Sequence, residues 1–221
     1  MRNARVGGAA VVVFLAARAA GVAADDSGPA RYVIYLHGRI VQEQQSGRPR
    51  SDRFGYYELA KILDAFRGRG FIVTGDIRPK SASVSESADR VVGQVRRLLD
   101  SGVSADRVTV VGASMGAGIA LLASTRLQNP DVRFCILGAC LSENVPPLLA
   151  SEGKGPRGHL LAIREASDDV VGPCLPWKND PDSPSRLSAR EIVVNTGLSH
   201  GFLYRPLPEW VGPVAEWAGA R

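Results

Sequence analysis

From residue 30 onward, short apolar runs alternate with amphipathic stretches, and this alternation restricts the fold more than any other feature of the chain. The runs are short, rich in Val, Ile and Leu, and bounded by turn residues, as β-strands are. They cover residues 31–38, 70–76, 107–112, 132–140, 159–166 and 191–195. Apolar strands that are separated by helices form a parallel sheet with helices on both faces. The sequence therefore predicts an α/β fold, a three-layer doubly wound sheet of about six mostly parallel strands.

Between and after these strands, apolar residues recur at helical spacing. The predicted helices cover residues 54–68, 83–99, 115–127 and 210–217. Ser83 and Glu86 form a capping-box pattern at the start of the second helix. The third helix is small or aliphatic throughout, which is typical of a buried helix.

The N-terminal segment, residues 1–24, has the layout of a secretory signal peptide. Arg2 and Arg5 form a basic start, an apolar run follows, and small residues precede a predicted cleavage site after Ala24. The apolar run is about twelve residues long, whereas a spanning helix needs roughly 18 or more. We therefore expect an exported protein, periplasmic or secreted, with a single domain over residues 25–221 and no stable membrane anchor. An uncleaved N-terminal anchor is the alternative.

Removal of that segment changes the charge of the chain. The segment contains three arginines and no acidic residue, so the net charge falls from +5 to +2. A nearly balanced charge gives no indication of a nucleic-acid partner, and none is predicted. The sequence does not indicate an oligomeric state.

The chain contains three cysteines, Cys135, Cys140 and Cys174. An odd number leaves at least one thiol unpaired in an exported protein. We predict a disulfide between Cys140 and Cys174, with three separate thiols as the alternative, and place Cys135 in the core. No metal-ligand spacing such as C-x-x-C or H-E-x-x-H occurs, so neither a metal nor another cofactor is predicted.

The pattern G-x-S-x-G, typical of the nucleophile turn of serine hydrolases, occurs twice, at residues 112–116 and 197–201. That turn has to join a strand to a helix. Ser114 has an apolar strand before it and a helical stretch after it, and its flanking glycines relieve crowding at a strained backbone position. Ser199 follows a strand, but prolines stand where the helix would run. We therefore predict Ser114 as the nucleophile; a glycine-rich turn without chemistry is the alternative.

A serine hydroxyl reacts once a general base takes its proton, and an acid has to orient that base. His37 ends the first strand and is predicted to be structural. His159 begins a strand and is predicted to be exposed or satisfied locally. His200 follows the last strand, on the same edge of the sheet as Ser114. The second G-x-S-x-G pattern is therefore predicted to present the base; a plain loop histidine is the alternative.

The acid should follow a strand that lies between these two segments. Asp168 and Asp169 both follow the strand over residues 159–166. We prefer Asp168 because it lies nearer the strand; Asp169 is the main alternative and Glu165 a minor one.

An oxyanion hole of backbone N–H groups completes such a site. One donor is predicted to be Met115, directly after the nucleophile. The other is predicted in the loop after the first strand, where Gly38 allows close approach, with Arg39 preferred and Ile40 as the alternative.

Four segments, "YLHGRI", "GASMGAG", "SDDVVGP" and "LSHGF", resemble the oxyanion, nucleophile, acid and histidine segments of the α/β-hydrolases, in the same order. The resemblance implies a minimal α/β-hydrolase fold that lacks the two usual N-terminal strands. It also implies a Ser…Asp…His triad, with Asp168 favoured because the family acid commonly precedes a run such as "VVGP". The region after "GACLSE" is short, which implies a short or absent lid and an open pocket.

The resulting hypothesis is a serine hydrolase that cleaves an ester-like bond of a small or extended small-molecule acyl substrate. The alternatives are amide or thioester hydrolysis, acyl transfer at the same site, or a non-enzymatic binding protein on this scaffold. A basic loop could bind an anionic substrate group or could simply be solvated; its arginines are Arg48, Arg50 and Arg53. Trp177 could line the pocket or pack within its loop.

Overall fold

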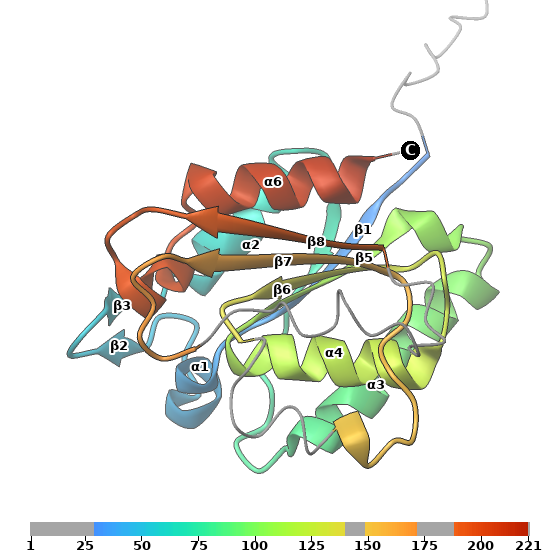
Figure 1. The fold of residues 1–221 in the computed structure, drawn as a ribbon, viewed down its shortest axis with the longest axis horizontal. Coiled ribbons are helices and arrows are strands. Elements are labelled where there is room, and N and C mark those ends of the chain that lie inside the picture. The colour runs from blue at the N-terminus through green and yellow to red at the C-terminus, as the bar shows by residue number, and fades with distance from the viewer. Residues whose placement is uncertain (1–28, 140–148, 172–187, 221) are drawn as a thin grey trace, which may run out of the picture.

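The computed structural model describes residues 29–139, 149–171 and 188–220, and its centre is a six-stranded sheet (Figure 1). Every neighbouring pair of strands is parallel. The order across the sheet is β4 (Ile72–Thr74), β1 (Tyr32–Leu36), β5 (Val108–Ala113), β6 (Arg133–Leu137), β7 (His159–Glu165) and β8 (Ser188–Val194). The predicted fold class is confirmed, and each strand overlaps its predicted range. β8 begins three residues earlier than the sequence predicts.

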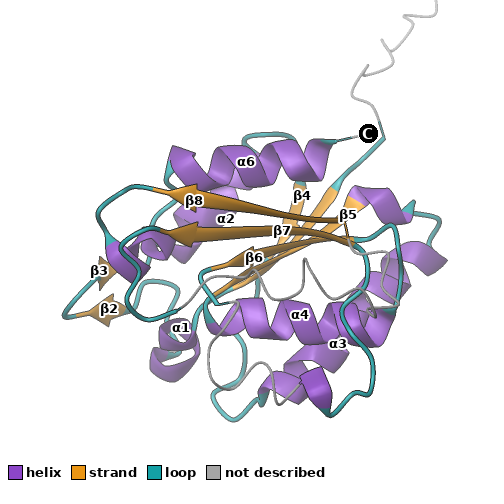
Figure 2. Ribbon diagram, in the orientation of Figure 1, coloured by secondary structure: helices purple, strands orange, loops and turns teal. Residues whose placement is uncertain are grey.

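Helices cover both faces of the sheet (Figures 1 and 2). One face carries α3 (Val84–Asp100) and α4 (Met115–Leu127), and the other carries α2 (Leu59–Arg67) and α6 (Pro208–Gly219). Alternate residues of β1 point to opposite faces, as the pleat requires, so Ile34 joins the first core and Val33 the second. The predicted capping box is present, because Ser83 and Glu86 each accept a hydrogen bond from the other's backbone N–H.

Two elements were not expected from the sequence. A six-residue helix, α1 (Arg39–Gln44), starts directly after the first strand, and a small antiparallel hairpin follows it, β2 (Arg50–Ser51) and β3 (Gly55–Tyr56). The helix predicted over residues 54–68 corresponds to α2 and begins only at Leu59. Burial explains the later start: Tyr57 is almost fully buried, and its hydroxyl shares a hydrogen bond of 2.7 Å with that of Tyr35.

The two rims of the sheet have different roles. At the rim where the strands begin, Arg31 Nη1 donates to Ala218 O at 3.0 Å, and Arg133 Nη2 donates to Ala220 O at 3.0 Å. These bonds hold the end of α6 against the starts of β1 and β6. The other rim, where parallel strands end, is where ligand sites of such sheets lie.

Other expectations fall on particular residues. Cys135 is fully buried within β6, as predicted, and burial raises the pKa of its thiol well above the ordinary value. Cys140, Cys174 and Trp177 lie outside the described residues. Within the described ranges, no helix has both the length and the apolar character needed to cross a membrane.

Candidate active site

Ser114 lies in a sharp turn between the central strand β5 and α4. Its backbone has φ 54° and ψ −119°, a conformation that L-residues rarely adopt, and its N–H donates to Leu137 O at 2.8 Å. The flanking glycines are required by space. A Cβ on Gly112 would overlap the carbonyl of Gly116, and a Cβ on Gly116 would overlap the carbonyl of Leu36. Such strained non-glycine positions cluster at functional sites.

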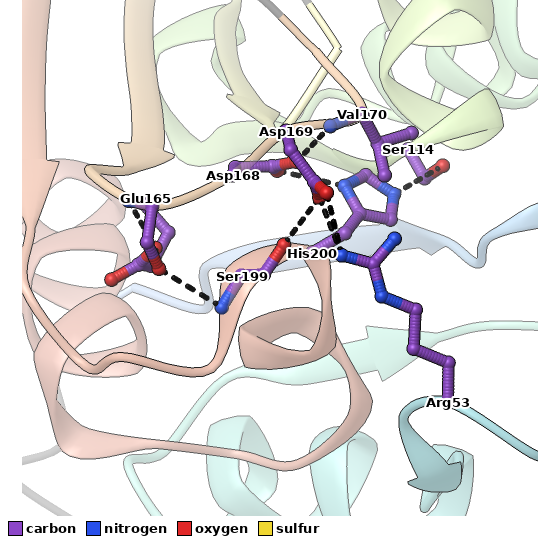
Figure 3. A network of polar contacts seen from close by, with 9 residues as sticks. Arg53, Ser114, Glu165, Asp168, Asp169, Val170, Ser199 and His200 are labelled. Atoms are coloured by element: carbon purple, nitrogen blue, oxygen red, sulfur yellow. Dashed lines mark hydrogen bonds and ion pairs between the residues drawn. The ribbon is translucent and has the colours of Figure 1, made fainter.

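The three side chains predicted as a triad lie in one hydrogen-bonded row (Figure 3). His200 Nε2 is 2.9 Å from Ser114 Oγ, and His200 Nδ1 is 2.8 Å from Asp168 Oδ2. The Asp168 side chain is fully buried, and its second oxygen accepts the backbone N–H of Val170 at 2.9 Å. A carboxylate only accepts, so His200 donates from Nδ1 and its Nε2 is left to accept the serine proton.

Asp169, the alternative acid, points elsewhere (Figure 3). Arg53 Nη2 donates to both of its carboxylate oxygens, at 2.8 and 2.6 Å, and Ser199 Oγ donates to one of them at 2.8 Å. These bonds, that from Arg53 first, lower the pKa of Asp169. The structure thus brings Asp168 to His200 and uses Asp169 to join the β2–β3 hairpin to the serine before His200.

Glu165, the minor candidate, is buried and braces the loop that carries His200. One of its oxygens accepts the backbone N–H groups of Thr196 and Gly197, at 2.9 and 3.0 Å, and the other accepts that of Ser167 at 2.6 Å. Burial alone would raise the pKa of this carboxyl, but the hydrogen bonds from Ser167, Gly197 and Thr196 outweigh it, so the net pKa is lowered. Glu165 therefore fixes the position of the histidine loop from below.

His200 lies in a short 3₁₀ helix, η3 (Ser199–Tyr204). Its ring lies against Phe54 of the hairpin, with the ring centroids 6.2 Å apart. A Cβ on Gly201 would come within 2.9 Å of the Phe54 ring, so glycine at this position lets the hairpin pack closely.

The backbone groups predicted for the oxyanion hole flank Ser114. Met115 is the first residue of α4, and the first amides of a helix have no carbonyl of their own helix to bind. Gly38 packs on the nucleophile, since a Cβ there would be 3.6 Å from Ser114 Cβ. Arg39 follows as the first residue of α1, and Ile40 lies one residue further into that helix.

The remaining candidates have structural contacts. His37 is fully buried, its Nδ1 lies 2.8 Å from Gly38 O, and burial first, then the charge of Arg78, lowers its pKa to about 4. His159 is partly buried, with its ring centroid 6.5 Å from that of Trp217. Arg48 pairs with Glu58 at 3.1 Å.

Arg50 and Arg53, which could bind an anionic substrate group or simply be solvated according to the sequence, have contacts within the protein. The backbone N–H of Arg50 donates to Gln44 Oε1 at 3.1 Å, and the Arg53 guanidinium also lies over the Phe54 ring at 4.8 Å. In the part of the chain that the structure describes, no group of three or more His, Cys, Asp or Glu side chains is arranged to hold a metal ion.

Comparison with known proteins gives two kinds of match. No protein-family model matches the chain. An acetyl-hydrolase from Streptomyces hygroscopicus is 29% identical over 112 residues, which are 51% of this chain and 35% of that protein. The chain thus matches only about a third of the length of that relative.

Several solved structures match most of the chain, and two of them serve as examples. One is an α/β-hydrolase enzyme from a Medee basin deep-sea metagenome library, with a TM-score of 0.50, 15% identity, and coverage of 86% of this chain and 84% of the other. The second is the esterase domain of a Rhodothermus marinus protein, with a TM-score of 0.51, 14% identity, and coverage of 87% and 89%. Together with the sheet order and the strained serine between β5 and α4, these matches identify the fold. The chain has an α/β-hydrolase fold.

Proposed function

We propose that this protein is a serine hydrolase that cleaves carboxylic ester bonds of a small-molecule acyl substrate. The observation that carries the proposal is the unbroken row of hydrogen bonds from Asp168 through His200 to Ser114. A hydroxyl, a neutral imidazole and a buried carboxylate in this order are the groups that acyl transfer needs.

In the proposed reaction, Ser114 Oγ attacks the ester carbonyl while His200 Nε2 takes its proton. The imidazolium, held by Asp168, then gives that proton to the departing alkoxide, which leaves an acyl-enzyme and an alcohol. Water attacks the acyl-enzyme, again with His200 as the base, and releases the carboxylic acid and free Ser114. No cofactor takes part.

The negative oxygen formed in each attack is proposed to bind the backbone N–H groups of Met115 and Arg39. Their places support this assignment, because one begins α4 beside the nucleophile and the other follows Gly38, which packs on Ser114. Removal of one donor of this kind from such a site costs about 10²–10³ in rate.

Short acyl groups are the first substrates to test. The partial relative from Streptomyces hygroscopicus is named an acetyl-hydrolase, and one structural neighbour is an esterase domain.

We further propose that the protein is exported after cleavage following Ala24, without a stable membrane anchor.

The test is turnover of 4-nitrophenyl acetate and butyrate by the purified protein, alongside Ser114→Ala and, as a matched control, Ser199→Ala. We expect wild type and Ser199→Ala to release nitrophenol and Ser114→Ala to lose turnover. A fluorophosphonate should label Ser114, located by peptide mapping. Equal turnover by wild type and Ser114→Ala would end the proposal.

A panel of acyl amides, thioesters and alcohol acceptors then defines the reaction more finely. Preferential cleavage of amides or thioesters, or acyl transfer to the alcohol in preference to water, would keep the triad and change the bond. Absence of both turnover and labelling would instead favour a binding protein on this scaffold.

A further inference from the structure

A buried arginine contacts the turn that joins β1 to α1. Arg78, in the connection between β4 and α3, is only 8% exposed. Among the described residues no carboxylate lies within ion-pair distance of it, and its Nη1 makes no hydrogen bond. Burial lowers the pKa of its guanidinium to about 10, which still leaves the group charged at neutral pH. A buried charge without a counter-charge costs several kcal/mol in order of magnitude, so its presence here calls for a compensating role.

Two hydrogen bonds of Arg78 converge on one residue, His37. Its Nη2 donates to His37 O at 2.7 Å, and its backbone N–H donates to His37 Nε2 at 3.1 Å. Its Nε donates to Gln42 Oε1 at 2.9 Å, which ties the same side chain to α1. The Arg78 side chain therefore holds the main chain of His37, and the Arg78 backbone N–H holds the His37 ring.

These bonds determine the tautomer of His37. Because Nε2 accepts a hydrogen bond from the backbone N–H of Arg78, the single proton of the neutral ring is on Nδ1. Nδ1 lies 2.8 Å from Gly38 O and therefore donates to it. The lowered pKa of His37, about 4, keeps the ring neutral over the ordinary working range of pH.

Gly38 is also packed against a buried ring. A Cβ on Gly38 would lie 3.8 Å from Tyr57 Cε2, and the Tyr57 hydroxyl shares a hydrogen bond of 2.7 Å with the buried hydroxyl of Tyr35. Gly38 O and Arg39 N–H belong to one trans peptide group, in which the two bonds point in opposite directions. When His37 fixes the carbonyl, it also fixes the direction of the Arg39 N–H.

We propose that Arg78 is a positioning residue for the oxyanion hole, acting through His37 to aim the Arg39 N–H at the reacting carbonyl oxygen. This inference rests on the proposed function, because an oxyanion forms only if Ser114 attacks a carbonyl. Arg78 itself does not touch the substrate. Its effect belongs to the transition state, where a misdirected N–H costs rate and leaves binding of the ground-state ester nearly unchanged.

The place of the turn supports the same conclusion. A Cβ on Gly116, in the first turn of α4, would lie 3.0 Å from His37 O, the atom that Arg78 holds. The bonded carbonyl of His37 thus lies directly against the start of the nucleophile helix. If the bond from Arg78 were removed and the turn shifted, both predicted donors of the oxyanion hole, the N–H groups of Arg39 and Met115, would be displaced.

The test compares Arg78→Met with Arg133→Met. Arg133 is a matched control because it is 7% exposed and also donates to backbone carbonyls, those of Asp106 and Ala220, but at the opposite rim of the sheet. We expect Arg78→Met to lower kcat for 4-nitrophenyl acetate by about 10–100-fold, with KM within about threefold. Arg133→Met should lower stability and leave kcat nearly unchanged. Arg78→Lys, which can still donate to His37 O, should recover part of the lost kcat.

Affinity for an inhibitor that forms a tetrahedral oxyanion on Ser114, such as a trifluoromethyl ketone, gives a second readout. We expect this affinity to fall in proportion to kcat/KM in Arg78→Met and to remain in Arg133→Met. A merely structural role would not produce that proportion. Equal kcat in the two variants, or unchanged inhibitor affinity in Arg78→Met, would overturn the inference.

If Arg78→Met does not fold, His37 gives an independent comparison. His37→Asn keeps a donor near the place of Nδ1, whereas His37→Leu removes it. The inference requires a lower kcat in His37→Leu than in His37→Asn, and equal values would refute it. If the wild-type protein has no ester turnover, the proposed function is contradicted. That result is distinct from equal turnover by the two His37 variants, which would contradict only the role of Arg78.

Discussion

The serines of the two G-x-S-x-G turns have nearly the same backbone φ angle and contact different groups. Ser114 has φ 54° and Ser199 has φ 50°. The hydroxyl of Ser114 meets His200, whereas the hydroxyl of Ser199 donates to Asp169. The first turn leads into a thirteen-residue helix and the second into a short 3₁₀ helix.

The glycines of the two turns also differ. Around Ser114 both glycines are required by space, because a Cβ on either would overlap a backbone carbonyl. Around Ser199 the first glycine, Gly197, supplies a left-handed backbone with φ 69° and open space about it, and the second makes room for a ring. The same five-residue pattern is therefore proposed to carry a nucleophile in one place and to present a base in the other. The pattern and a strained serine do not define a nucleophile; the group that the hydroxyl meets does.

The largest expected effect separates the two carboxylates that contact the second turn, Asp168 and Asp169. Asp168→Asn should lower kcat by about 10⁴-fold, because an amide favours the wrong tautomer of His200. Asp169→Asn should lower it by less than about tenfold, since Asp169 contacts Arg53 and Ser199 instead. Steady-state ester hydrolysis measures both, and the reverse order would exchange the roles of the two acids.

The next effect concerns the crowded glycines. Gly116→Ala should destabilise the fold by about 3 kcal/mol or more, because its Cβ would overlap the carbonyl of Leu36 and the backbone has to move. Gly197→Ala should cost only about 1 kcal/mol, the price of a left-handed alanine in open space. Urea unfolding followed by circular dichroism gives both values. Similar losses would mean that the first turn is less rigid than its contacts imply.

The third effect is pH-dependent and belongs to the second turn. The pKa of Glu165 is lower in the folded protein than in the unfolded chain. Its carboxylate therefore stabilises the fold at pH values above the ordinary glutamate pKa of about 4.3. This stabilisation is lost as the pH falls through the lower pKa of the folded protein. Glu165→Gln should cost about 2 kcal/mol at pH 7, because charge-assisted hydrogen bonds to the 196–197 backbone are weakened. Urea unfolding at pH 7 and below pH 4 should show the difference between variant and wild type shrinking in acid. A difference that is constant with pH would contradict the assignment.

The smallest effect tests the second serine directly. Ser199→Ala should change kcat by no more than about threefold, since its exposed hydroxyl bonds only an exposed carboxylate. Ester turnover at low and high salt measures it. A loss comparable to that of Ser114→Ala would show that the 197–201 turn takes part in the chemistry.

The elements that could be predicted from the sequence are those determined by neighbouring residues. Six apolar runs predicted the sheet, and the Ser83 and Glu86 pattern predicted the start of α3. The segment 115–127 coincides with α4 because small and aliphatic residues both favour a helix and permit its burial. The choice of Ser114 over Ser199 also rested on local features, the strand before it and the helix after it.

What sequence reasoning missed depends on contacts between distant segments. A six-residue helix such as α1 is not stable in isolation, so its own residues carry little signal. Arg53 and Asp169 pair across 116 residues, and Arg78 reaches His37 across 41. Glu165 was a minor candidate for the acid, and only the folded loop reveals its four N–H and O–H donors. These partners become visible once the strand order is known.

The bonds from Arg31 and Arg133 to the last residues of α6 have a practical consequence. They place the first strand and Ala220 together at the rim opposite Ser114 (Figure 1). A tag, a bead or a fused protein joined beyond Ala220 would therefore lie at the rim opposite Ser114. The same closeness makes the start of β1 and Ala220 suitable points to join in a circular permutant, with new ends opened in a surface loop away from Ser114.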